Sequence, residues 1–195
     1  MANENSLNTL GQLIVSSVPK FVESVTVENG QLVLTCKSSN LVSLLEYLRD
    51  SSFLQFNTLL DVFGMDNLQR SVHNRFEVVY FLLSYSRSER LLVRVSLDSE
   101  VELPSVSSVF SSAVWLEREI WDMFGLFFKN HPDLRRILTD YGFRGFPLRK
   151  DFPISGYTEV RYSEKRKRVI VKPLQLTQEY RFFEFLTPWN QYFNK

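Results

Sequence analysis

The side chains best placed for chemistry are three carboxylates in one short segment, Glu117, Glu119 and Asp122. Carboxylate oxygens at this spacing could bind a divalent metal ion or hold cationic side chains. The Glu-x-x-His pattern of di-iron helices is absent, and His73 and His131 are the only histidines. Carboxylates so close together repel one another unless they are compensated. We therefore expect arginines, from this chain or from a partner, to pair with them.

The sequence lacks the motifs that hold redox cofactors and nucleotides. Cys36 is the only cysteine, whereas an iron–sulfur cluster needs several thiolates. No Gly-x-Gly-x-x-Gly loop, no Gly-Lys-Ser/Thr phosphate loop and no Gly-x-Ser-x-Gly elbow occurs. We therefore predict no catalytic residue, metal ion or cofactor in this chain. Cys36 is expected to be a small buried side chain in a strand.

The three carboxylates lie on a predicted amphipathic helix, Val114–Phe124, which Gly125 is placed to end. Its apolar residues share one face: Leu116, Ile120, Met123, Phe124 and, just beyond, Phe127. Further on, proline and glycine interrupt a run of arginine and aromatic residues, so no long helix can form there. His131 precedes Pro132, which favours an extended conformation. We expect His131 to make a structural hydrogen bond to a neighbouring loop rather than to transfer a proton.

The segment from Trp115 to Tyr162 resembles the signature of the 30-kilodalton subunit of respiratory complex I, the proton-pumping NADH:ubiquinone oxidoreductase. Every fixed position of that signature is filled, by Glu117, Arg118, Glu119, Asp122, Met123, Phe124, His131, Arg135, Ile137 and Leu138. The runs DLRRILTDYGF and PLRKDFP also resemble the family and add Arg136, Arg149 and Asp151 as candidate interface residues. Phe146 stands where the family usually has His, so no role is carried over for a second histidine.

The resemblance implies a non-catalytic structural subunit in the hydrophilic, peripheral arm of the complex. It would belong to the quinone module, pack against the 49-kilodalton-type subunit, and support electron transfer from NADH to ubiquinone. Flavin, iron–sulfur clusters and quinone would be held by partner subunits. The N-terminus shows no Arg-rich presequence, and the 17 phenylalanines fit synthesis inside a mitochondrion. We expect a peripheral position on the matrix side of the mitochondrial inner membrane, or on the cytoplasmic face if the source is bacterial.

Hydrophobic periodicity predicts an α+β fold with two layers, a largely antiparallel sheet and helices on one face. The expected strands are Phe21–Val27, Gln31–Cys36, Gln55–Phe63, Phe76–Tyr85 and Leu91–Leu97, with a hairpin turn at Asn29-Gly30 and another turn at residues 64–66. The expected helices begin near Ser6 and Asn40, cover Pro104–Phe110, and end with the signature helix. We place the α+β domain at residues 1–128 and an extended, partner-docking segment at 129–195.

Charge and aromatic residues set the C-terminal part apart. Residues 115–195 carry 15 basic and 10 acidic side chains, whereas residues 1–114 carry 8 basic and 12 acidic ones. From Pro173 to Lys195 we predict an arm that lies across a neighbouring subunit, anchored by aromatic residues, namely Phe182, Phe183, Phe185 and Trp189. An alternative is a nucleic-acid-binding module that uses the basic run 161–172. Glu159 and Glu164 interrupt this patch, and a net charge of +1 is low for that role.

Overall fold

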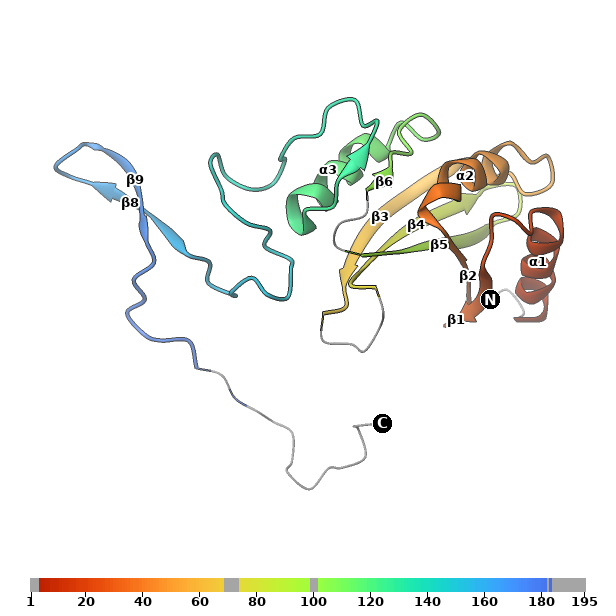
Figure 1. The fold of residues 1–195 in the computed structure, drawn as a ribbon, viewed down its shortest axis with the longest axis horizontal. Coiled ribbons are helices and arrows are strands. Elements are labelled where there is room, and N and C mark those ends of the chain that lie inside the picture. Colours follow the sequence, from red (N-terminus) through yellow and green to blue (C-terminus); the bar gives the residue numbers. More distant parts are fainter. Residues whose placement is uncertain (1–3, 69–73, 99–101, 182, 184–195) are drawn as a thin grey trace, which may run out of the picture. The chain divides into compact units, whose positions relative to one another are not determined.

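The computed structural model describes residues 4–68, 74–98, 102–181 and 183. It divides into two compact units, Met1–Phe152 and Pro153–Lys195. In the described residues, the first unit contains a five-stranded sheet and three α-helices, and the second contains a two-stranded hairpin (Figure 1). Among the described residues, no helix combines the length and the hydropathy that a membrane crossing requires.

The sheet of the first unit has the strand order β1-β2-β5-β4-β3. Its strands are β1 Ser24–Glu28, β2 Gln31–Cys36, β3 Thr58–Asp66, β4 Phe76–Ser84 and β5 Glu89–Leu97. All neighbours are antiparallel except β2 and β5, which run parallel. Asn29 and Gly30 have φ angles of 52° and 74°, as a two-residue hairpin turn requires, so the predicted β1–β2 hairpin is confirmed.

One face of the sheet carries the core. Phe76, Val78, Tyr80 and Leu82 alternate along β4 and are fully buried, as period-2 patterning requires. The helices α1 Glu4–Ser17, α2 Leu41–Asp50 and α3 Ala113–Phe124 bury their apolar stripes in the same cluster, through side chains such as Ile14, Leu44 and Ile120. A short 3-10 helix, η1 Ser38–Asn40, precedes α2. The predicted α+β class is confirmed.

Two local predictions are wrong. The turn predicted at residues 64–66 is the end of β3, where Gly64 pairs with Val78. A Cβ on Gly64 would lie 2.9 Å from the ring of Phe124, which belongs to the helix Ala113–Phe124. The missing side chain therefore lets this helix approach the sheet, and Gly64 does not reverse the chain. The helix predicted at Pro104–Phe110 is instead a short strand followed by turns. In it, β6 Leu103–Pro104 pairs in parallel with β7 Phe128–Lys129.

The boundary of the first unit lies beyond the predicted position. Residues 130–152 have no regular helix or strand, yet they belong to the unit that ends at Phe152 and not to a segment that begins at 129. Their polar contacts with α3, described below, explain this difference.

The second unit contains a hairpin that the sequence prediction missed. Strand β8 Thr158–Ser163 pairs antiparallel with β9 Arg168–Pro173. After β9, residues 174–181 have no regular secondary structure. Of the predicted anchors, Phe183 is described and is 60% exposed, whereas Phe182, Phe185 and Trp189 lie outside the described residues.

Candidate functional site

Helix α3 ends abruptly, and the chain then folds back over it. Gly125 has φ 74° and its N–H donates to the carbonyl of Trp121 at 2.9 Å, a left-handed cap that glycine adopts without strain. A Cβ at this position would lie 2.6 Å from the ring of Phe146. The glycine therefore ends the helix and leaves room for the returning chain, residues 130–152, which we call the return loop.

The carboxylate of Asp122 organises the centre of the return loop. Its side chain is buried and accepts hydrogen bonds from the backbone N–H groups of residues 137, 138 and 139, at 3.1, 2.8 and 2.9 Å. The hydroxyl of Thr139 donates at 2.7 Å and Nη1 of Arg136 at 3.0 Å. Burial alone would raise the pKa of Asp122, but the hydrogen bonds from Thr139 and the neighbouring N–H groups outweigh it and lower the pKa to about 2. The carboxylate thus stays ionised and fixes three consecutive peptide groups.

Arg118 holds the same stretch of chain from one helical turn away. Its Nε donates to the carbonyl of Arg135 at 3.1 Å and its Nη2 to that of Arg136 at 3.3 Å. Its guanidinium also lies 5.1 Å from the centre of the Trp115 ring. Arg118 supplies donors and Asp122 supplies acceptors, so together they satisfy both kinds of backbone group in a segment that makes no regular hydrogen bonds.

Glu117 forms a second buried polar cluster on α3. Its carboxylate accepts from the hydroxyl of Ser105 at 2.6 Å and from the N–H of Val106 at 2.7 Å. Burial raises the pKa of Glu117 to about 7, and these two hydrogen bonds only partly oppose it. The start of the segment predicted as the helix Pro104–Phe110 instead pairs with β7, and the N–H of Ser105 donates to the carbonyl of Lys129 at 2.9 Å.

His131 lies beside this carboxylate, with Nε2 at 3.7 Å from Oε2 of Glu117 and no exposed side-chain surface. The N–H of Asp133 donates to Nδ1 at 3.1 Å, so Nδ1 acts as an acceptor and Nε2 is the donor nitrogen. From there it donates to the carbonyl of Val114 at 3.1 Å. His131 therefore connects the start of the return loop to the first turn of α3.

A third cluster attaches the end of the return loop to the sheet. Asp66, at the end of β3, accepts from Nε and Nη2 of Arg75 at 3.1 and 3.0 Å and from the N–H of Lys150 at 2.9 Å. Burial opposes ionisation of Asp66, yet the hydrogen bonds from Arg75 and the N–H of Lys150 lower its pKa. Nη2 of Arg75 also reaches Asp151 at 3.0 Å. Arg149 donates to the carbonyl of Phe124 and stacks on the ring of Phe146 at 4.5 Å.

The predicted site residues lie in different surroundings. Arginine compensates only Asp122, whereas Glu117 is held by Ser105 and a backbone N–H, so the expectation that arginines pair with all three carboxylates is wrong for Glu117. Glu119 points to solvent, and Arg135 is exposed with an ion pair to Asp133 at 2.9 Å. Among the described residues, no group of three His, Cys, Asp or Glu side chains is arranged to hold a metal ion.

The sequence prediction missed Asp66, Arg75 and Ser105 as members of these clusters. Asp66 and Lys150 lie 84 positions apart, so no local pattern connects them. Arg75 directly precedes the apolar alternation of β4, and its match to the Arg-Phe-x-Val-Val-Tyr strand of the resembling family gave no indication of its partners.

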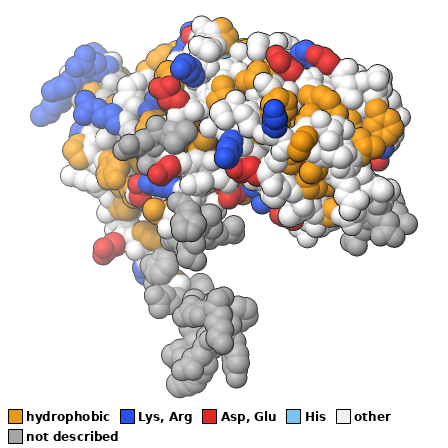
Figure 2. Space-filling view, turned by 45° about the vertical axis from the view of Figure 1, so that its right-hand side comes forward, with side chains coloured by type: hydrophobic (Ala, Val, Ile, Leu, Met, Phe, Trp, Pro, Cys, Tyr) orange, Lys and Arg blue, Asp and Glu red, His pale blue; other side chains and the backbone are white. Residues whose placement is uncertain are grey.

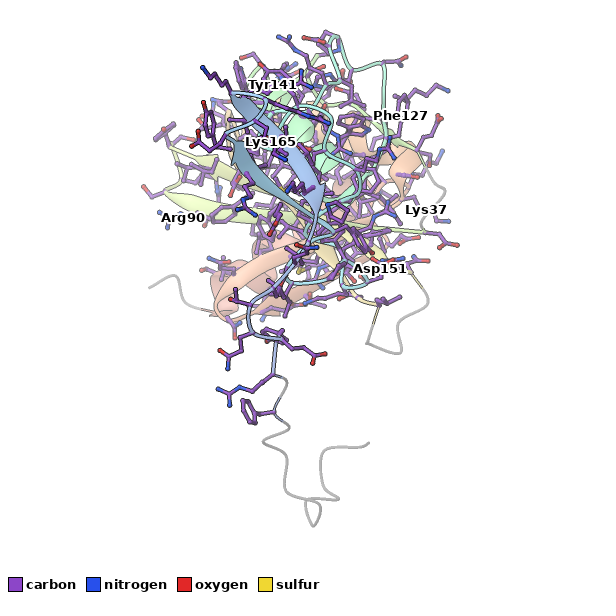
Figure 3. The ribbon with its side chains drawn as sticks, turned by 90° about the vertical axis from the view of Figure 1, so that its left-hand side faces the viewer. Lys37, Arg90, Phe127, Tyr141, Asp151 and Lys165 are labelled. Atoms are coloured by element: carbon purple, nitrogen blue, oxygen red, sulfur yellow. The ribbon has the colours of Figure 1, made fainter. Side chains whose placement is uncertain are left out.

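Hydrogen bonds from α3 and from Asp66 hold the backbone of the return loop, but the loop exposes apolar side chains to solvent. Leu138, whose N–H binds Asp122, has 60% of its surface exposed, and Tyr141 is fully exposed. Leu148 and, just before the loop, Phe127 are about half exposed. Figure 3 labels Phe127 and Tyr141. We call Leu138, Tyr141 and Leu148 the loop surface.

Comparison with known proteins agrees with this architecture. Residues 34–158 match the family model described as "Respiratory-chain NADH dehydrogenase, 30 Kd subunit". An NADH-quinone oxidoreductase subunit of Paramagnetospirillum magneticum is 50% identical over 94% of this chain and 92% of its own length. NADH-ubiquinone oxidoreductase subunit 9 of Reclinomonas americana is 44% identical over 95% of this chain and 90% of its own length.

A solved chain of the membrane-bound sulfane sulfur reductase, an archaeal respiratory membrane complex, aligns with a TM-score of 0.63. The match covers 75% of this chain and 85% of that chain at 22% identity, a likeness of fold. With the family match and the two close relatives, the conclusion is direct: the chain belongs to the family of the 30-kilodalton subunit of respiratory-chain NADH dehydrogenase.

Proposed function

We propose that this chain is a non-catalytic core subunit of the peripheral arm of a proton-pumping NADH:ubiquinone oxidoreductase. In this proposal it belongs to the quinone module and packs against the 49-kilodalton-type subunit through its loop surface. Flavin, iron–sulfur clusters and quinone belong to partner subunits, and this chain holds those subunits in position. It is a peripheral component on the matrix side of the mitochondrial inner membrane, or on the cytoplasmic side of a bacterial one.

One observation carries the docking part of this proposal. The signature residues Arg118 and Asp122 form hydrogen bonds with backbone groups of the return loop. The loop itself exposes the side chains of Leu138 and Tyr141 to solvent. Charged groups inside a protein are costly unless they are fully hydrogen-bonded. Here they hold an irregular loop in one conformation before any partner arrives, which lowers the entropy lost on binding. Tyrosine is among the residue types enriched at protein interfaces, and an exposed tyrosine on a fixed loop is typical of an interface anchor.

The exposed signature residues Glu119 and Arg135 are proposed to extend the loop surface. Glu119 and Arg135 make few contacts inside the first unit and lie in solvent, although they belong to the same motif as the buried groups. We assign them to the rim of the interface, where charges select the partner and speed association. The aromatic arm from Pro173 to Lys195 is a second proposed contact with the partner.

The test uses the full chain expressed with the rest of its complex. The double variant Leu138→Ser/Tyr141→Ser should keep the thermal melting temperature of the free chain, because both side chains are exposed. It should reduce the amount of assembled complex several-fold while leaving the turnover of each assembled complex unchanged. Tyr85→Ser is the matched control, since Tyr85 is 70% exposed outside the loop surface.

Two results would contradict the proposal. Normal assembly of the double variant would remove the loop surface from the interface. Normal assembly with lost turnover would point to a direct role in catalysis instead.

A further inference from the structure

The β8–β9 hairpin has two faces of opposite character. Cross-strand pairing puts Val160 beside Val171 and Tyr162 beside Val169 on one face, which also carries Thr158 and Pro173. The opposite face carries mostly polar and charged residues, Glu159, Arg161, Ser163, Arg168, Ile170 and Lys172. We call the first of these the apolar face. Because side chains alternate along a strand, this division follows directly from the register.

The side chains of the apolar face are exposed in the part of the chain that the structure describes. Val160, Val169 and Val171 have 61, 62 and 66% of their surface exposed, and Tyr162 has 53%. A hairpin of only two strands is marginally stable in water without a covered face. Contiguous exposed apolar side chains of this kind mark interaction surfaces.

The turn of the hairpin supplies the charge. It contains Lys165, Arg166 and Lys167, Arg168 begins β9, and Figure 2 shows Lys and Arg side chains gathered together on the surface. Residues 158–173 hold six basic and two acidic side chains. Among the described residues, none of these six makes an ion pair. Figure 3 labels Lys165 on the hairpin.

We propose that the β8–β9 hairpin is a docking element whose apolar face packs on an aliphatic surface of another subunit, with acidic side chains of that subunit facing Lys165–Arg168. The inference rests on the proposed function, because it takes the partner to be a protein of the same complex. It adds a third contact, separate from the loop surface and preceding the aromatic arm. The basic residues at the turn and the acidic residues of the partner attract one another, which fixes the orientation of the bound hairpin.

The composition of the apolar face favours a protein over a lipid surface. Its hydrophobic side chains are three valines, one tyrosine and one proline. Elements that lie in a membrane interface carry tryptophan, phenylalanine and leucine, which reach into the acyl chains. Short β-branched side chains on a pleated ribbon suit packing against a sheet or a helix. The acidic Glu159 and Glu164 also oppose binding to anionic lipid or nucleic acid.

The experiment introduces one new cysteine into the full chain and measures maleimide labelling, free and in the assembled complex. The native Cys36 is buried and burial raises its pKa to about 12, so it stays unreactive. Val171→Cys lies on the apolar face, and the control Arg161→Cys lies on the opposite face and is also exposed. Both should label in the free chain. In the complex, labelling of Val171→Cys should slow about tenfold or more, since a covered thiol reacts only through opening events, while Arg161→Cys stays reactive.

A second pair of variants tests the charge. Arg166→Glu/Lys167→Glu should weaken assembly and make it less sensitive to salt, whereas Lys20→Glu/Lys129→Glu, at exposed positions of the first unit, should not. If both double variants weaken assembly equally, the proposed contact between Lys165–Arg168 and acidic side chains of the partner is overturned.

The outcomes separate this inference from the proposed function. If the wild-type chain does not enter a complex, the proposed function fails. If it does, and Val171→Cys labels as fast in the complex as in the free chain, the hairpin inference alone is overturned. Protection of the free chain by vesicles of phosphatidylcholine and phosphatidylglycerol, or by an oligonucleotide, would assign the face to lipid or nucleic acid and would also overturn it.

Discussion

The β4–β5 and β8–β9 hairpins have similar strand chemistry and opposite surroundings. In the first, Tyr80 pairs with Val93 and Val78 with Val95, and all four side chains are fully buried under the helices. In the second, Tyr162 pairs with Val169 and Val160 with Val171, and all four are more than half exposed. Valine and tyrosine in alternation thus predict a strand in both places, but burial depends on whether the chain itself supplies a cover.

The two units also differ in how they use charge. The first unit buries the ionised carboxylate of Asp122 and satisfies it with hydrogen bonds from within the chain. The second unit leaves its basic run in solvent. Buried, satisfied charges rigidify the structure that holds them, whereas exposed unpaired ones are available to a partner. We read the first unit as a self-sufficient scaffold and the hairpin as an element completed by assembly.

The largest expected effect is a loss of stability of the first unit when the buried carboxylate of Asp122 is removed. Asp122→Ala removes the shared acceptor of three backbone N–H groups, the Thr139 hydroxyl and Nη1 of Arg136, all of which are partly buried. The free energy of unfolding, measured by urea denaturation, should fall by about 3–5 kcal/mol. Exposed Glu119→Ala is the matched control and should change it by less than about 0.5 kcal/mol. Equal effects of the two variants would show that the return loop does not depend on Asp122.

A somewhat smaller effect should appear as a pH dependence of the first unit. The folded-state pKa of Glu117 is about 7, above the ordinary value of 4.5, so the folded chain holds a proton that the unfolded chain releases. Stability from this group is therefore full below about pH 4.5 and declines as pH rises to 7, by roughly 3 kcal/mol at most. Asp122, with a lowered pKa of about 2, contributes no slope in this range, because both states are ionised there.

Glu117→Gln checks this origin, because an amide does not titrate. Urea denaturation between pH 5 and 8 should give a flatter profile for the variant than for the wild type. If both profiles fall equally, the pH dependence arises from another group.

The smallest expected effects compare the two hairpins directly. Val93→Thr places a hydroxyl in the buried face of β5 and should lower the free energy of unfolding by about 1–3 kcal/mol. Val171→Thr makes the same change on the exposed face of β9 and should alter it by less than about 0.5 kcal/mol in the free chain. Thermal melting of the free chain measures both. A large loss for Val171→Thr would mean that the hairpin face is part of a core within this chain.

The sequence by itself determined the elements with strong periodicity. Strands β2, β4 and β5, the Asn29-Gly30 turn and helix α3 with its Gly125 cap follow from alternation, helical spacing and the special conformations of glycine. It also contained the signature, and with it the family. These features are local, so neighbouring residues carry them.

Only the tertiary structure decided what the signature residues do. Contacts between Asp122 and residues 136–139, Glu117 and Ser105, or Asp66 and Lys150 join segments that no sequence period relates. Gly64 could be read as a turn or as room for Phe124, and its pairing with Val78 settled the choice. The hairpin at 158–173 was hidden because its charged turn masked two short strands. Burial is a property of the whole fold, and the same valines are core in β5 and surface in β9.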